Sequence, residues 1–155
     1  MARRKLARSR PADSSRRPTR PARPGRRPAP AACPCGRPAV HAECCGRFHR
    51  GDAVPGTPEE LMRSRYAAFA LGETAYLLRT WHPDTRPATL DLEGSPRWTG
   101  LEILATSGGS AFHDEGTVTF RAHYRGADGE PGVQEECSRF TRVDGVWMYV
   151  DGTVT

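Results

Sequence analysis

The sequence has no long apolar stretch. None of its 155 residues belongs to a run that approaches the roughly 18 to 20 apolar residues needed to cross a membrane. The N-terminus also lacks the apolar core of a secretory signal. These absences predict a cytoplasmic protein without a membrane partner, in a compartment that keeps thiols reduced.

Acidic residues are almost missing from residues 1–32, where Asp13 stands alone against eleven of the chain's 23 lysines and arginines. Six prolines and very few apolar side chains complete a composition typical of disorder. Residues 33–155 carry 12 basic and 17 acidic residues, so the basic character belongs to the tail. We expect a disordered tail over 1–31, which either contacts nucleic acid weakly or has no dedicated partner.

A CxxC redox pair is also missing, although the chain has five cysteines. Four of them lie in the stretch CPCGRPAVHAECC, namely Cys33, Cys35, Cys44 and Cys45. A bond between adjacent cysteines would close a strained ring, and other pairings need an oxidising compartment. Metal binding is therefore favoured over a disulfide, and the lone Cys137 is expected to be a packing residue or a free thiol.

Zinc fits this spacing of cysteines. Four thiolates at about 2.3 Å from the ion place their sulfurs roughly 3.7 Å apart, so the ligands must come from two short, turned segments. The CxC and CC pairs supply such segments. A complete set of four leaves no position for water, which predicts a structural Zn²⁺ without catalysis. His41 and His49 are spare ligands that would have to replace a cysteine.

Two helices are predicted next. Thr57 can cap the first, Pro58 suits its first position, and Glu60 completes a capping box. Apolar residues then recur at helical spacing as far as Gly72, and a shorter helix is expected over residues 73–81.

From Trp98 onward the apolar residues alternate, which predicts strands. Asp144 and Gly145 form a strong hairpin signal between the last two strands. Helices followed by an antiparallel meander of about four strands indicate an α+β fold, with the helices on one face of a curved sheet.

A two-residue turn at this hairpin predicts that Ser138 lies opposite Asp151. One sheet face would then carry Glu136, Ser138, Phe140, Arg142, Trp147, Tyr149 and Asp151. Aromatic walls with Glu136 and Asp151 about 7 to 8 Å apart on a diagonal indicate a small-molecule cavity, in which buried carboxylates could act as general acid or base.

Four side chains from the preceding helices are expected to close this cavity: Arg65, Tyr66, Trp81 and His82. The alternative is a packed core without a pocket, in which Arg142 lies over Trp147 and the carboxylates pair with arginines or solvent. His113 and His123 suggest no site.

Separated motifs resemble a known family. CPCG followed by CC is similar to the SEC-C zinc motif, found at the C-terminus of the translocase SecA and in small bacterial proteins. CCGRFHRG, LMRSRYAAFALGETAYLLRTWHPDTRP and SRFTRVDGVWMYVDG resemble the YchJ family of uncharacterised bacterial proteins. The resemblance implies a zinc-binding segment over 32–51 and, over 52–155, a cone-like domain similar to nuclear transport factor two.

Three functions follow from these patterns. The first is a zinc-binding cytoplasmic protein whose segment recognises a protein partner, as an adaptor does. The second is a small-molecule hydrolase, isomerase or dehydratase that uses the sheet cavity. The third is weak nucleic-acid binding through the basic tail, which predicts a steep dependence on salt. An enzyme is less favoured than an adaptor, since the family resemblance supplies no activity.

Overall fold

The computed structural model describes residues 29–155, so the tail predicted over 1–31 lies almost wholly outside the described residues. In chain order the elements are a 3₁₀ turn η1 (His41–Glu43), helices α1 (Cys45–His49), α2 (Pro58–Leu71) and α3 (Thr74–Arg79), and strands β1 (Arg97–Gly108), β2 (Glu115–Arg125), β3 (Pro131–Val143) and β4 (Val146–Val154). None of the helices in this part of the chain is long and apolar enough to cross a membrane.

Helix α2 begins and ends where its local sequence predicts. The Thr57 hydroxyl accepts a hydrogen bond from the Glu60 amide at 3.1 Å, and the Glu60 carboxylate accepts one from the Gly56 amide at 2.8 Å. Gly72 ends the helix in the left-handed conformation, with φ of 76°. Helix α3 is shorter than expected, because Trp81 leaves the helix and forms a parallel bridge with Tyr149 of β4.

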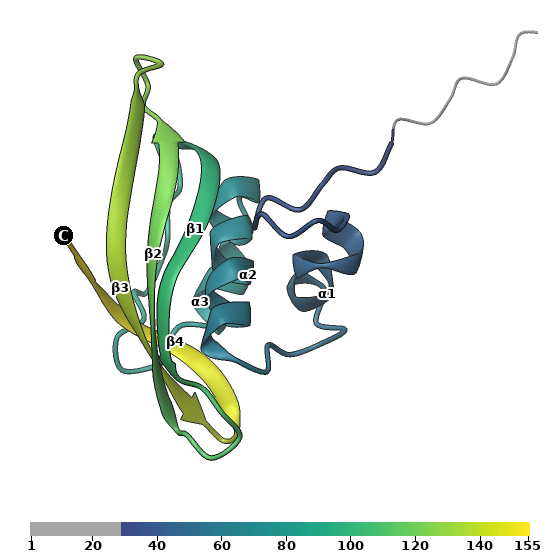
Figure 1. Cartoon of the computed structure of the whole chain (residues 1–155), viewed down its shortest axis with the longest axis vertical. Coiled ribbons are helices and arrows are strands. Elements are labelled where there is room, and N and C mark those ends of the chain that lie inside the picture. Colours follow the sequence, from purple (N-terminus) through teal and green to yellow (C-terminus); the bar gives the residue numbers. More distant parts are fainter. Residues whose placement is uncertain (1–28) are drawn as a thin grey trace, which may run out of the picture.

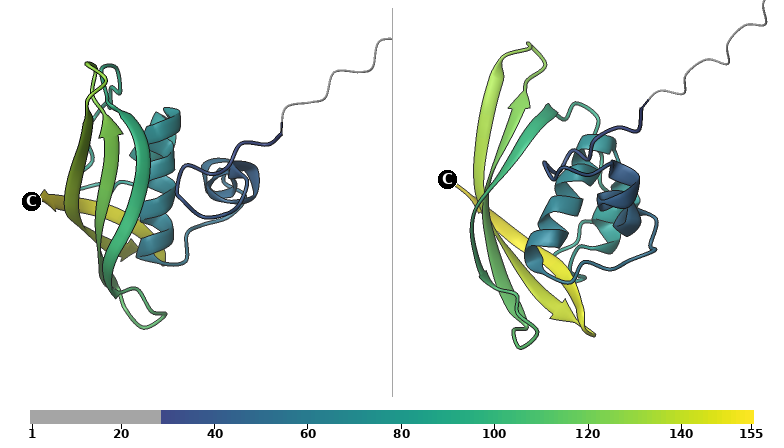
Figure 2. Two further views of the ribbon diagram at one scale, coloured as in Figure 1. Left: turned by 45° about the horizontal axis from the view of Figure 1, so that its top comes forward. Right: turned by 45° about the vertical axis from the view of Figure 1, so that its right-hand side comes forward.

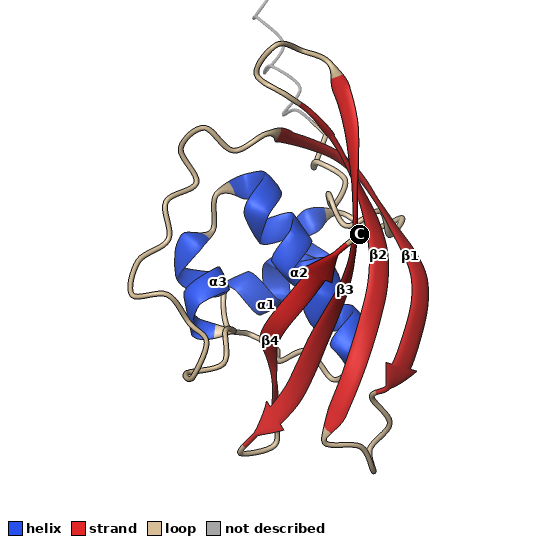
Figure 3. Ribbon diagram, turned by 90° about the vertical axis from the view of Figure 1, so that its left-hand side faces the viewer, coloured by secondary structure: helices blue, strands red, loops and turns tan. Residues whose placement is uncertain are grey.

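The four strands form one antiparallel meander in the order β1-β2-β3-β4, so the α+β prediction is confirmed. Figure 1 shows three layers: the curved sheet, then α2 and α3, then the segment that contains α1. The two views of Figure 2 agree that the segment lies on the side of α2 away from the sheet. Figure 3 shows the strands fanning across the helices.

The hairpin register is confirmed only near its turn. Phe140 lies opposite Tyr149, as predicted, but a β-bulge follows and Arg139 then lies opposite Asp151. The predicted pairing of Ser138 with Asp151 is therefore wrong. One extra residue in β4 moves every later side chain to the other face of the sheet. Asp151 thus lies on the outer face, where its carboxylate accepts two hydrogen bonds from Arg139 at 2.7 and 2.6 Å.

Candidate functional site

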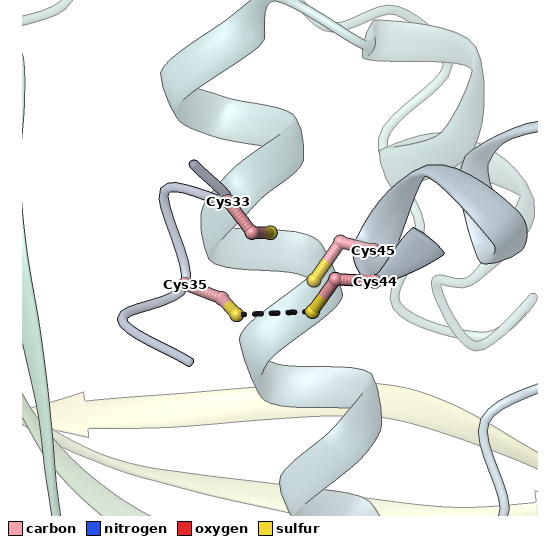
Figure 4. Close-up of side chains that lie close together, drawn as sticks. All are labelled: Cys33, Cys35, Cys44 and Cys45. Atoms are coloured by element: carbon pink, nitrogen blue, oxygen red, sulfur yellow. Dashed lines mark hydrogen bonds between the residues drawn. The ribbon is translucent and has the colours of Figure 1, made fainter. Parts of the chain in front are cut away.

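The four cysteine side chains converge on one point beside α2 (Figure 4). All four are buried, and their sulfurs lie within 4.8 Å of one another. The Sγ atoms of Cys35 and Cys44 are 3.6 Å apart, close to the roughly 3.7 Å between sulfurs around a tetrahedral zinc ion. The predicted ligands are therefore brought together, in an arrangement that could hold a metal ion.

Two local features shape this cluster. The amide of Cys33 donates to the carbonyl of Ala39 at 2.9 Å, which closes the loop between the two cysteine pairs. Cys44 and Cys45 lie at the start of α1, and both of their side chains point toward Cys33 and Cys35 (Figure 4). The next residue, Gly46, packs so tightly that a Cβ atom there would lie 2.6 Å from the carbonyl oxygen of His41.

The cysteine thiols shift one another's pKa values because they lie close together and are buried. Hydrogen bonding from Cys45 lowers the pKa of Cys35 to about 4, whereas burial raises the pKa of Cys44 to about 11. The hydrogen bond to Cys35, together with burial, raises the pKa of Cys45. The neighbouring thiols thus stabilise a thiolate at Cys35, and burial disfavours a negative charge at Cys44 and Cys45.

The cysteine segment, residues 32–51, is anchored on α2 and α3 by polar contacts to its backbone. Arg63 of α2 donates to the carbonyl of Cys35 at 2.7 Å. Arg79 of α3 donates to the carbonyls of Phe48 and His49 at 2.9 and 2.8 Å, at the end of α1. The His49 ring in turn bonds the Ser64 carbonyl at 2.8 Å. These contacts fix the segment relative to α2 and α3.

Apolar contacts complete this anchoring. The cysteines pack against Ala67, and Phe48 packs in a cluster with Ala68, Tyr76 and Leu77. His41 and His49, the spare metal ligands, bond each other at 3.3 Å and lie outside the cysteine group.

A cavity of about 220 Å³ lies between α2 and the inner face of the sheet. Six of the predicted residues line it: Arg65, Tyr66, Trp81, Glu136, Ser138 and Tyr149. Sequence reasoning missed six more: Met62, Phe69, Trp98, Phe120, Ala122 and Gln134. Met62 and Phe69 carry the helical spacing, and Phe120 and Ala122 alternate in β2. The spacing of these four residues in the sequence therefore already placed them on the faces that line the cavity.

Four predicted cavity residues do not line the cavity. Phe140 and Trp147 fill the core, where Trp147 donates its indole N–H to the Gly56 carbonyl at 3.2 Å. The ring of His82 instead accepts a hydrogen bond from the Asp84 amide at 3.1 Å. Asp151 is lost to the outer face through the bulge. The predicted pair of carboxylates in one cavity is consequently wrong.

Glu136 faces neutral donors. Its carboxylate accepts hydrogen bonds from Ser138 at 2.9 Å and Gln134 at 3.2 Å, with the Tyr149 hydroxyl at 3.4 Å. Burial raises the pKa of Tyr149 to about 12, so its hydroxyl keeps its proton at neutral pH. The Glu136 side chain also lies over Gly152, where even a Cβ atom would overlap the carboxylate.

Arg65 is the cation of the cavity. It is only 2% exposed, and its guanidinium carbon lies 4.4 Å from the Tyr149 ring centre and 5.0 Å from that of Trp81. Its Nη1 donates to Leu77 O and Thr80 Oγ1, both at 2.8 Å. Burial lowers the pKa of Arg65 to about 10, which still leaves it charged at neutral pH. By contrast, Arg142 lies 4.7 Å over Trp147 in the packed core, as the alternative interpretation predicted.

Comparison with known proteins places this architecture. The model of the YchJ middle NTF2-like domain matches residues 57–152. A UPF0225 protein of Streptomyces coelicolor is 64% identical over 106 residues, which cover 68% of this chain and 82% of that protein. A UPF0225 protein of Corynebacterium glutamicum is 50% identical over 108 residues, covering 70% and 85% of the two chains. The chain belongs to the YchJ family.

Two solved structures are similar to this fold. A SEC-C motif-containing protein from Rhodopseudomonas palustris has a TM-score of 0.70 and 31% identity, covering 78% of this chain and 96% of that one. A SEC-C motif-containing protein from Psychrobacter arcticus has a TM-score of 0.62 and 27% identity, with 79% and 82% covered. The predicted resemblance to the YchJ family is thus confirmed, and both similar structures are of SEC-C motif-containing proteins.

Proposed function

We propose that Cys33, Cys35, Cys44 and Cys45 bind one zinc ion as four thiolates, and that this ion holds the segment 32–51 in its folded form. The observation that carries the proposal is the convergence of four buried sulfurs from two short segments within 4.8 Å. A closed set of four thiolates leaves no ligand position for water, so the role is structural.

The surroundings of the cluster support this role. Arg63 and Arg47 donate to the carbonyls of Cys35 and Cys44, at 2.7 and 3.2 Å, and their positive charges offset the net negative charge of a zinc tetrathiolate. Such a site also fits a reducing compartment, the cytoplasm, in which thiols stay available for metal. A protein partner for the exposed side of the segment stays a prediction.

Metal analysis tests the proposal. Full-length protein purified without added metal should contain one zinc ion per chain, whereas the double variant Cys35→Ser/Cys45→Ser should contain almost none. Cys137→Ser is the matched control, because this cysteine lies on β3, away from the cluster, and it should keep its zinc. The proposal fails if the double variant retains one zinc ion per chain.

Substitution with Co²⁺ identifies the ligands. A site of four thiolates should give intense sulfur-to-metal charge-transfer bands and the visible bands of a tetrahedral ion. A spectrum typical of octahedral oxygen and nitrogen ligands would contradict the assignment.

A further inference from the structure

The cavity on the inner face of the sheet adjoins the main hydrophobic cluster and is not filled by side chains. Met62, Tyr66, Phe120 and Ala122 line it and also belong to the main hydrophobic cluster. Protein interiors rarely leave such volumes empty, because their walls lose contacts. Several lining residues, including Phe69 and Gln134, are partly exposed, so the space is reachable from solvent. At about 220 Å³ it is smaller than the roughly 300 to 1,000 Å³ of drug-sized sites.

Opposite charges in the lining restrict what this cavity binds. Arg65 brings a positive charge that, among the described residues, has no carboxylate within ion-pair distance. Glu136 brings a negative charge that is held by neutral donors alone in this part of the chain. The two charges cancel in sum, so the cavity offers no net charge to a ligand.

A charged ligand is disfavoured whatever its sign. An anion would face the carboxylate of Glu136, and one nitrogen of the Arg65 guanidinium, Nη1, already donates to the carbonyl of Leu77 and the hydroxyl of Thr80. A cation would face Arg65, which already lies against the rings of Trp81 and Tyr149. Either ion would also lose its hydration in a mostly apolar space.

A hydrogen-bond donor on the ligand is favoured instead. A carboxylate has about four acceptor sites, and three donors approach Glu136, the weakest of them Tyr149 at 3.4 Å. A hydroxyl group of a ligand would add a charge-assisted bond there, and the rest of the molecule would cover the aromatic walls.

We propose that this cavity binds a small uncharged molecule, mostly apolar, that carries a hydroxyl group and donates it to the carboxylate of Glu136. Arg65 balances that carboxylate and excludes amines, while Glu136 excludes carboxylic acids. The cavity is lined by α2 and the sheet, whereas the segment that contains α1 lies on the other side of α2 (Figure 1), so this site is distinct from the cysteine cluster.

Four matched compounds test the proposal on the full-length protein: benzyl alcohol, toluene, benzoate and benzylamine. The three tryptophan indole N–H signals in a ¹H–¹⁵N spectrum report binding. Trp81 and Trp98 line the cavity, whereas Trp147 is hydrogen-bonded in the core and serves as an internal control. Benzyl alcohol should shift the first two signals with a dissociation constant on the order of a millimolar. Benzoate and benzylamine should bind about tenfold more weakly or worse.

Variants assign the role of Glu136. Glu136→Gln should weaken benzyl alcohol about fivefold and leave toluene unchanged, because only the alcohol uses the charge-assisted bond. Glu135→Gln is the matched control, since this neighbour pairs with Arg121 and does not line the cavity. Ala122→Val narrows the cavity and should weaken both compounds, which keeps the test available if Glu136→Gln does not fold.

Four results would overturn the proposal. The first is benzoate or benzylamine binding as tightly as benzyl alcohol. The second is an equal effect of Glu136→Gln on benzyl alcohol and toluene. The third is a shift at Trp147 as large as those at Trp81 and Trp98. The fourth is binding that Ala122→Val leaves unchanged.

Discussion

Replacing Phe48 by alanine tests whether the cysteine segment and the sheet domain, residues 52–155, unfold as one unit. Phe48 is 5% exposed and packs against Ala68, Tyr76 and Leu77 of α2 and α3. Removing a buried phenylalanine ring destabilises a protein by about 3–5 kcal/mol, because apolar burial is lost and a cavity remains. Since total stabilities are about 5–15 kcal/mol, the change is large. For a chain of this size it lowers Tm by roughly 6–20 °C.

The assay uses the position of the tryptophans. All three, Trp81, Trp98 and Trp147, lie outside the cysteine segment, so their fluorescence during urea unfolding reports the sheet domain alone. We expect Phe48→Ala to move this transition to lower urea by the full amount. Phe112→Ala is the matched control, because Phe112 is 97% exposed and its loss should change stability by less than about 0.5 kcal/mol.

The refuting result is specific. If the tryptophan transition of Phe48→Ala coincides with that of the unsubstituted protein, while thiol accessibility rises at lower urea, the segment unfolds separately. The contacts of Phe48 and Arg79 would then contribute nothing to the stability of the sheet domain.

Two further predictions concern β4. Asp151→Asn should lower the free energy of unfolding by less than about 1 kcal/mol in urea titrations at pH 7, because its pair with Arg139 is exposed. Hydrogen bonding from Arg139 lowers the pKa of Asp151. The stabilisation from this pair is therefore present above the ordinary pKa of about 3.9 and is lost as the pH falls further. An equal effect of Asp151→Asn at pH 7 and at pH 2 would contradict this pH dependence. Gly152→Ala should destabilise by about 1–3 kcal/mol and shift the Trp81 and Trp98 indole signals, because a Cβ atom displaces Glu136 from its donors; unchanged stability and signals would show that the carboxylate does not need this space.

Local signals account for what could be predicted from the sequence. The Thr57 cap, the Gly72 end of α2 and the Asp144-Gly145 turn each depend on residues a few positions apart. The cysteine ligands belong to the same group, since metal geometry limits how thirteen residues can fold around one ion. For these features the chain's own chemistry leaves few alternatives.

The bulge in β4 shows where such reasoning stops. No residue in the hairpin sequence indicates that β4 has an extra residue, Val150, between the partners of Phe140 and Arg139. Contacts distant in sequence lie at the bulge: Trp81 forms a bridge with Tyr149, and the Thr85 hydroxyl donates to the carbonyl of Val150 at 2.7 Å. A shift of one residue exchanges the two faces of a strand, and this single event removed Asp151 from the expected cavity.

The burial of both sides of α2 could not be predicted from the sequence either. Its sequence gives Met62, Tyr66 and Phe69 as the apolar face, and those residues do face the sheet cavity. The opposite side carries Ser64 and Ala67, which as small residues resemble an exposed face in a sequence pattern. Both are instead fully buried: Ala67 packs against the cysteines, and the Ser64 hydroxyl lies 2.6 Å from the Tyr76 hydroxyl. Helix α2 therefore belongs to two cores at once, and a change on either side is expected to be felt by the other.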